Sequence, residues 1–138
     1  MNSEIEVRIN AEVNRAYYTF DRYKADATFA MVYHENELTL EELGNYLRIS
    51  DRFVQYDENN YFVLFHFTGT NEAYNASQNL LFKLDKHFNN NSTCIGIDEF
   101  NTSNSTRIVL NKLKQIIKET RKNSITRIEY EDILDSSI

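Results

Sequence analysis

The chain has 138 residues with a hydrophobic share of 41% and a charged share of 26%, which is typical of one globular domain with a single core. Its net charge of −6 disfavours general nucleic-acid binding, because an acidic surface repels phosphate backbones. The sequence has no proline, and therefore no rigid linker to a second domain. It also lacks a signal-peptide-like start and a long apolar run, so we expect a cytoplasmic protein without membrane contact.

The N-terminal part of the chain, 1–26, carries apolar residues at helical spacing, which predicts a helix over about 4–24. A short apolar run over 28–33 has the length of a strand. Thr39 can cap a brief helix over 39–46, since a threonine hydroxyl accepts hydrogen bonds from first-turn N–H groups. The first third of the chain is therefore expected to fold as a helix, a strand and a short helix.

Two strand-like runs, 52–56 and 61–67, flank the polar stretch 57–60. Turn-forming residues between two apolar runs predict a β-hairpin. The remaining predicted elements are a helix over 71–88, a strand over 93–97, a helix over 105–121, an edge strand over 125–130 and a frayed tail over 131–138.

The order of these elements predicts the fold class. A hairpin pairs its strands antiparallel, whereas helical crossovers imply parallel neighbours. We therefore expect one α/β (α+β) domain over 1–138, with a mixed sheet of about five strands, helices on both faces and a ferredoxin-like core.

The predicted hairpin and its flanks carry a motif. Arg48-Ile49-Ser50-Asp51 is followed, after five residues, by the signature Asp57-Glu58-Asn59-Asn60-Tyr61. This spacing resembles the bacterial GGDEF (diguanylate cyclase) family, in which Arg-x-x-Asp precedes Gly-Gly-Asp/Glu-Glu-Phe at a hairpin turn. Asn14-Arg15, Cys94-Ile95-Gly96-Ile97 and Arg127-Ile128 are similar to other family segments in the same order. The resemblance implies a nucleotidyl cyclase palm-like fold and a role in signal transduction.

The catalytic requirements implied by the resemblance are not met at the signature. Family members bind GTP over a turn of two glycines and hold divalent metals with carboxylates. Here Asp57 and Glu58 replace the glycines, and the neutral amide of Asn59 replaces a metal-binding carboxylate. At the end of the first strand, Tyr33 or His34 stands where the resemblance places an aspartate.

A shortened segment adds to this prediction. Active members place two helices between the first strand and the Arg-x-x-Asp motif, and residues that read guanine lie there. The corresponding segment, 34–47, has room for one short helix. We therefore expect a degenerate domain, a pseudoenzyme with no catalytic residue, no cofactor and no bound Mg²⁺.

Other chemical interpretations carry less weight. Residual cyclase activity, or another metal-dependent nucleotide reaction, would need a displaced metal site built from Asp57 and Glu58 with Asp51 or Asp98. Adjacent hairpin residues point to opposite faces, which favours solvated turn charges instead. Structural roles are expected for the three histidines and the single cysteine, and a solvated helix face for the C-terminal cations: His34, His66, His87, Cys94, Lys112, Lys114, Lys118, Arg121 and Lys122.

Arg48 and Asp51 leave two readings open. In the family this pair forms an inhibitory site for cyclic di-GMP, so the resemblance implies that Arg48 contacts guanine and phosphate and that Asp51 accepts from a guanine edge. The two side chains could equally form a local ion pair at the start of the second strand. A cyclic di-GMP receptor is thus the alternative to our main expectation of a regulatory or protein-interaction module.

The partner of such a module is an unknown signalling protein or a second copy of the chain. Aromatic residues on the N-terminal helix either pack on the domain or pair with another chain: Tyr17, Tyr18, Phe20 and Tyr23.

Overall fold

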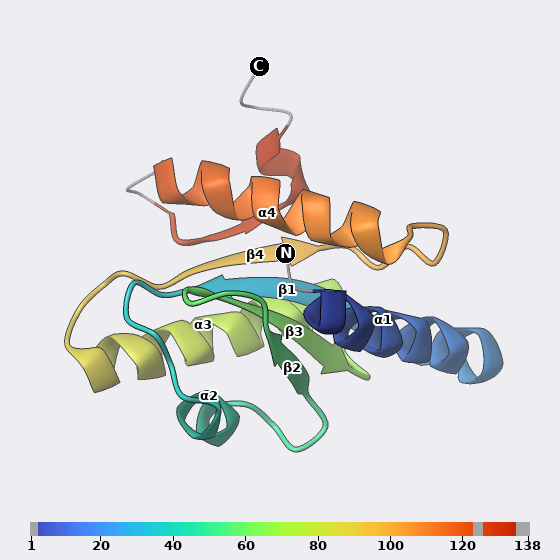
Figure 1. Ribbon diagram of the computed structural model, residues 1–138, viewed down its shortest axis with the longest axis horizontal. Coiled ribbons are helices and arrows are strands. Elements are labelled where there is room, and N and C mark those ends of the chain that lie inside the picture. The colour runs from blue at the N-terminus through green and yellow to red at the C-terminus, as the bar shows by residue number, and fades with distance from the viewer. Residues whose placement is uncertain (1–2, 123–125, 135–138) are drawn as a thin grey trace.

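The computed structural model describes residues 3–122 and 126–134. Its elements are α1 (Ser3–Tyr23), β1 (Ala27–Tyr33), α2 (Leu40–Tyr46), β2 (Arg52–Gln55), β3 (Asn60–His66), α3 (Thr70–Phe88), β4 (Cys94–Asp98), α4 (Thr106–Lys122), β5 (Ile128–Tyr130) and the 3₁₀ helix η1 (Glu131–Leu134). Helices cover both sides of the sheet (Figure 1). The predicted order of elements is confirmed.

The sheet has five strands in the order β2-β3-β1-β4-β5. The central strand β1 pairs antiparallel with both β3 and β4, and β2 pairs antiparallel with β3 as a hairpin. β5 pairs parallel with β4 after the α4 crossover. The first four strands therefore form a ferredoxin-like arrangement, and the fifth makes the sheet mixed, as predicted. Parallel neighbours, expected at each helical crossover, occur in the described part of the chain only for β4 and β5, because the strands joined through α2 and through α3 are each separated by another strand.

Alternation along β1 divides the core into two layers. Phe29 and Met31 face a cluster that includes α1 and α4. Ala30 and Val32 face a second cluster that includes α2 and α3. Because successive strand residues point to opposite sides, an apolar strand at the centre of the sheet can support helices on both of its faces.

A glycine in β4 sets the distance of α4 from the sheet. A Cβ atom at Gly96 would lie 2.8 Å from Cγ2 of Ile116 on α4, closer than packed carbons can approach. The bare glycine lets α4 lie directly on β4. The C-terminal half of α4 lies beside the hairpin, where Lys114 donates to the Tyr56 hydroxyl at 3.2 Å.

Local signals account for several helix ends. Thr39 and Glu42 form a capping box at the start of α2, as Thr39 predicted. Asn89 ends α3 in the left-handed conformation with φ 51°, and its N–H donates to the Asp85 carbonyl.

The C-terminal region differs in part from the prediction. The strand expected over 125–130 is limited to Ile128–Tyr130, and Ile125 lies outside the described residues. Within the segment predicted as a frayed tail, η1 is ordered against α4, where Lys112 Nζ lies 2.9 Å from Glu131 Oε1. Residues 135–138 lie outside the described part. An ion pair across two elements is not visible in local sequence, which explains the difference.

The aromatic residues of α1 have two different environments. Tyr17 and Phe20 pack edge-on against Phe100, within the domain. Tyr18 and Tyr23 are exposed. Across 3–122 and 126–134, no helix is both long and apolar enough to cross a membrane.

Candidate functional site

The turn between β2 and β3 is closed by its own side chains. The Asp57 carboxylate accepts from the backbone N–H groups of Asn59 and Asn60, at 2.9 Å each, and from the Asn60 amide at 2.9 and 3.2 Å. A carboxylate that accepts from the N–H groups two and three positions further along the chain stabilises a tight turn. The first signature position therefore serves the turn itself.

Asn59 connects this turn to the end of β1. Its side-chain amide donates to the carbonyls of His34 and Glu35, both at 3.0 Å, and its own carbonyl accepts from the His34 N–H at 2.9 Å. The third signature position thus acts as a double hydrogen-bond donor. The side-chain oxygen that remains is a neutral amide oxygen, which is a weaker ligand for a hard cation than a carboxylate oxygen.

Tyr61, the fifth signature position, is fully buried. Its hydroxyl accepts from the Leu38 N–H at 2.7 Å and donates to the Leu38 carbonyl at 3.1 Å. Burial raises the pKa of this phenol. The hydroxyl satisfies backbone groups of the β1–α2 connection, which would otherwise be buried without partners.

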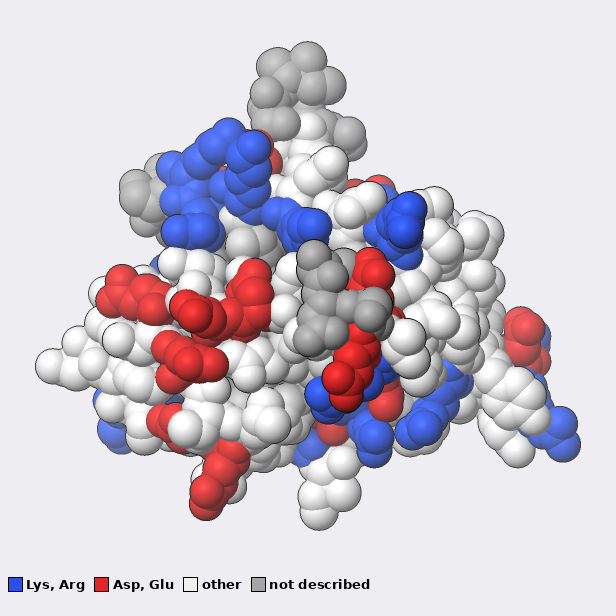
Figure 2. All heavy atoms as spheres, viewed as in Figure 1, with Lys and Arg blue, Asp and Glu red and all other residues white. Residues whose placement is uncertain are grey.

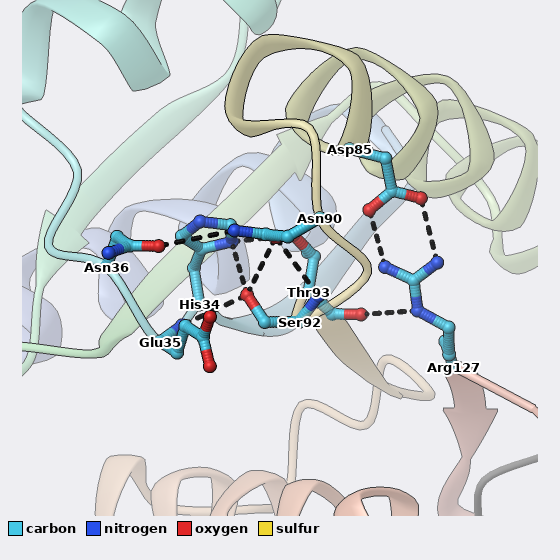
Figure 3. A network of polar contacts seen from close by, with 8 residues as sticks. All are labelled: His34, Glu35, Asn36, Asp85, Asn90, Ser92, Thr93 and Arg127. Atoms are coloured by element: carbon cyan, nitrogen blue, oxygen red, sulfur yellow. Dashed lines mark hydrogen bonds and ion pairs between the residues drawn. The ribbon is translucent and has the colours of Figure 1, made fainter.

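The end of β1 is packed rather than open. His34 is fully buried, its Nδ1 lies 2.8 Å from Thr93 Oγ1, and its ring lies against Phe88 with centroids 4.5 Å apart. Ser92 Oγ lies 3.3 Å from the same nitrogen (Figure 3). Burial lowers the pKa of His34, so the neutral ring is favoured. The preceding residue, Tyr33, lies under the guanidinium of Arg121, 3.9 Å from Cζ to the ring centroid.

The same network extends to β5 through Arg127. Its guanidinium makes two hydrogen bonds to the Asp85 carboxylate, at 2.8 and 2.6 Å, and a third to the Thr93 carbonyl at 3.0 Å (Figure 3). The bonds to Asp85 raise the pKa of Arg127. A bidentate pair of this kind fixes the relative position of α3, β4 and β5.

The carboxylates considered for a displaced metal site do not meet. Tyr33, next to the turn, pairs with Asn60, whereas Asp98 pairs with Phe29 near the other end of β1. Within 3–122 and 126–134, no group of three or more His, Cys, Asp or Glu side chains could hold a metal ion. The displaced site considered from the sequence is therefore not assembled in the described chain.

Arg48 and Asp51 form the local ion pair. Arg48 Nε and Nη2 donate to the two carboxylate oxygens at 3.1 and 2.9 Å, and the Arg48 backbone N–H donates at 3.0 Å. Arg48 Nη2 also donates to Thr68 Oγ1 at 2.7 Å. The Asp51 side chain is 1% exposed and that of Arg48 is 49% exposed. A ligand arriving from solvent would meet Arg48 and not Asp51.

Three solved structures share this arrangement of elements. Diguanylate cyclase SiaD from Pseudomonas aeruginosa, in complex with its activator SiaC, matches with a TM-score of 0.71 and 9% identity over 91% of this chain and 57% of that chain. The GGDEF domain of DgcB from Caulobacter crescentus, in complex with c-di-GMP, matches with a TM-score of 0.70 and 8% identity over 88% and 87%. The FimX GGDEF domain from Pseudomonas aeruginosa matches with a TM-score of 0.70 and 16% identity over 90% and 92%. The chain has the fold of a GGDEF domain.

The likeness is one of fold. No protein-family model and no curated protein matches the sequence. The chain spans little more than half of the SiaD chain but nearly all of the DgcB and FimX GGDEF domains. The resemblance first indicated by the Arg-x-x-Asp motif and the hairpin is confirmed at this level.

From the sequence, Asp98 was considered only as a candidate metal ligand, and its burial was missed. Asp98, at the end of β4, is fully buried, and neither carboxylate oxygen has a hydrogen-bond partner among the described residues. Lys112 Nζ lies 3.6 Å from Oδ1 and bridges to Glu131. Burial, which outweighs the nearby lysine, raises the pKa of Asp98 to about 6. In the sequence, the position of this acidic residue at the end of an apolar strand was the signal that could have indicated its burial.

A basic groove was also missed, because the cations of α4 were interpreted as a solvated face. Lys and Arg side chains gather over the C-terminal end of α4, in the upper left of Figure 2. Several of them line a groove of about 470 Å³ between α4 and the hairpin. We call it the α4 groove, and its lining residues are Tyr56, Asp57, Asn60, Lys114, Ile117, Lys118, Arg121 and Lys122. The spacing of Lys114, Lys118 and Arg121 along one face of α4 was the signal in the sequence for a basic surface.

Proposed function

We propose that this chain is a GGDEF-fold signalling domain that does not make cyclic di-GMP and acts by binding a protein partner. The observation that carries the proposal is the use of the signature turn as a structural connector. Asp57 closes the turn, Asn59 donates to the end of β1, and Tyr61 holds the β1–α2 connection.

Cyclase chemistry needs different groups at these positions. Joining two GTP molecules requires metal ions that neutralise phosphate oxygens, held by carboxylates, and a backbone that the nucleotide can approach. Asn59 supplies an amide already engaged with two carbonyls, and Asp57 supplies a negative charge. At the end of β1, Tyr33 and His34 supply an aromatic ring and a buried imidazole.

Incubation with radiolabelled GTP and either Mg²⁺ or Mn²⁺ tests the loss of cyclase chemistry. We expect no cyclic di-GMP and no linear dinucleotide above a protein-free blank. An active cyclase added to the same preparation controls for inhibitors, and a cooperative thermal transition controls for folding. Formation of either dinucleotide by the chain alone would overturn this part of the proposal.

A protein partner is consistent with the fold comparison, because SiaD was solved with its activator SiaC. A second copy of the chain is the simplest partner to test. Light scattering coupled to size-exclusion chromatography, over a wide concentration range, separates self-association from recognition of another protein. A monomer throughout that range leaves a different protein as the partner.

Binding of cyclic di-GMP through Arg48 is the second candidate. Its guanidinium is half-exposed and oriented by the buried Asp51 carboxylate, which suits an arginine that receives a phosphate or a guanine edge. DgcB, one of the structures with this fold, was solved with c-di-GMP. Calorimetry with cyclic di-GMP should then show binding that Arg48→Ala abolishes.

Arg52→Ala is the matched control for that titration, because the Arg52 side chain is 51% exposed and also forms an ion pair, with Glu12 at 3.2 Å. Tight binding of cyclic di-GMP that survives Arg48→Ala would show that Arg48 is not part of the binding site. Absence of binding by the folded wild-type chain would remove the receptor alternative altogether.

A further inference from the structure

The α4 groove carries positive charge that the described structure does not neutralise. Within 3–122 and 126–134, neither Lys118 nor Arg121 forms an ion pair with a carboxylate, whereas Lys122 lies 3.2 Å from Glu119. Arg121 lies in the last turn of α4, where a cation is favourable near the negative helix end. Lys114 and Lys118 lie one to two turns earlier, beyond the reach of that effect.

Two aromatic rings hold two of the cations, Arg121 and Lys114, in place. Arg121 lies over Tyr33 at 3.9 Å, and Lys114 lies over Tyr56 at 5.6 Å while donating to its hydroxyl at 3.2 Å. Side chains that are already ordered lose less entropy when they bind a ligand. Each ring has a cation over one face, which leaves less free aromatic surface for a nucleobase to stack on.

The spacing of the cations fits an extended peptide. Lys114, Lys118 and Arg121 lie about one turn apart along α4, roughly 4.5–6 Å. Alternate side chains of an extended segment point the same way and lie roughly 6.5–7 Å apart. Carboxylates at alternate positions of an extended segment can therefore follow the cations along the helix.

We infer that the α4 groove is the docking site for an extended acidic segment of a partner protein. The inference rests on the proposed function and names the chemistry of the partner. The Asp57 carboxylate on the opposite wall disfavours a compact polyphosphate more than it disfavours carboxylates spread along the helix, because repulsion grows with the charge brought close.

Fluorescence anisotropy with a labelled peptide of alternating Glu and Ser tests the inference on the full chain. The peptide should bind, a Gln-Ser peptide should not, and binding should weaken as added salt screens the charges. The double substitution K118E/R121E should weaken binding about tenfold, because it reverses two central cations. Amide signals of α4 and the hairpin should shift on titration.

The matched control is K83E/K86E. Lys83 and Lys86 have the same spacing as Lys118 and Arg121, are exposed, and lie on α3 on the other side of the sheet. This variant should bind the Glu-Ser peptide as the wild-type chain does. Thermal unfolding of both variants excludes a folding defect as the cause of any loss.

Several results would overturn the inference. They are absence of binding to the folded wild-type chain, equal loss in both double variants, or tighter binding of inorganic pyrophosphate than of peptide at Lys118 and Arg121. None of these would alter the GTP turnover result, so failure of the docking site and failure of the proposed function remain distinguishable.

Discussion

His34 and Asp98 are two buried ionisable residues near opposite ends of the sheet, and the fold treats them differently. His34 lies beside the hydroxyls of Ser92 and Thr93, and burial lowers its pKa. Asp98 has a cation, Lys112, at 3.6 Å but no hydrogen bond among the described residues, and burial raises its pKa to about 6. At the hairpin end, His34 is neutral and hydrogen-bonded at Nδ1, whereas the other end keeps a buried carboxylate with no hydrogen bond among the described residues.

The two residues give opposite pH dependences. The folded pKa of Asp98 is above its unfolded value of 3.8, so the folded state binds the extra proton and Asp98 makes the protein more stable as pH falls from about 6 to about 4. The folded pKa of His34 is below its usual 6.5, so its contribution is present above that pH and is lost as pH falls. Substitutions at four positions test the contrast between the two ends of the sheet.

The largest effect is expected for Asp98→Asn. At about pH 7.5 the wild-type carboxylate is ionised in the folded state although burial raises its pKa from 3.8 to about 6, and that penalty corresponds to about 3 kcal/mol. Removing the charge should raise the free energy of unfolding by up to that amount. The gain should vanish near about pH 4, where Asp98 is already protonated in the folded state. Urea denaturation at both pH values measures it.

Glu99→Gln is the control for Asp98→Asn, because Glu99 is the neighbouring acid and is exposed. It should leave stability nearly unchanged at both pH values. If Asp98→Asn proved neutral or destabilising at about pH 7.5, the ion pair with Lys112 would outweigh burial and the contrast between the two ends would be lost.

Tyr61→Phe tests the hydrogen-bonded end. Without the hydroxyl, the N–H and carbonyl of Leu38 lose their partner in a buried position. The expected loss in free energy of unfolding is about 2 kcal/mol. Tyr18→Phe, at an exposed tyrosine of α1, should change little in the same urea titration. Equal effects of the two substitutions would mean that the buried hydroxyl contributes nothing specific.

Asn59→Ala should cost about 1 kcal/mol, because it removes the donors to the carbonyls of His34 and Glu35. Asn59→Asp should cost more at neutral pH, since it places carboxylate oxygens against carbonyl oxygens. It should not create cyclase activity, because Tyr33 at the end of β1 and the buried His34 after it still supply no carboxylate. Thermal unfolding and GTP turnover check both. An Asp variant more stable than the wild type in Mg²⁺ would contradict this account.

The smallest effect is expected for His34→Asn, as a change in the pH dependence of stability below about pH 6.5. The acid-side loss of stability should be reduced, since the group that resists protonation is gone. Comparison in the Asp98→Asn background separates the two opposing contributions. Burial also lowers the pKa of His66. The change in the pH profile caused by His34→Asn is therefore compared with the change caused by His66→Asn. An unchanged pH profile would mean that His34 is not held neutral in the folded chain.

Much of this fold follows from signals carried by residues that are close together in the sequence. The apolar spacing that predicted α1 corresponds to the buried residues Ile9, Val13 and Ala16. Thr39 capped α2, and the polar turn between two apolar runs became the β2–β3 hairpin. Such signals concern neighbours along the chain, and periodicity reports which side of an element is apolar.

The Arg48–Asp51 pair was partly accessible in the same way. Residues three apart can meet locally, and the ion pair was one of two readings. The bond from Arg48 to Thr68 spans 20 positions and depends on where β3 ends beside the start of β2. Whether the pair also receives a ligand stays a prediction.

By itself, then, the sequence determined the order of helices and strands, the two-layer core and the likeness to GGDEF domains, because these follow from periodicity, turn chemistry and motif spacing. Only the tertiary structure decided that His34 meets Thr93 across 59 positions, that Asp98 is buried beside Lys112, and that the cations of α4 face the hairpin. Those contacts depend on strand register and on the close packing at Gly96, which no local pattern encodes.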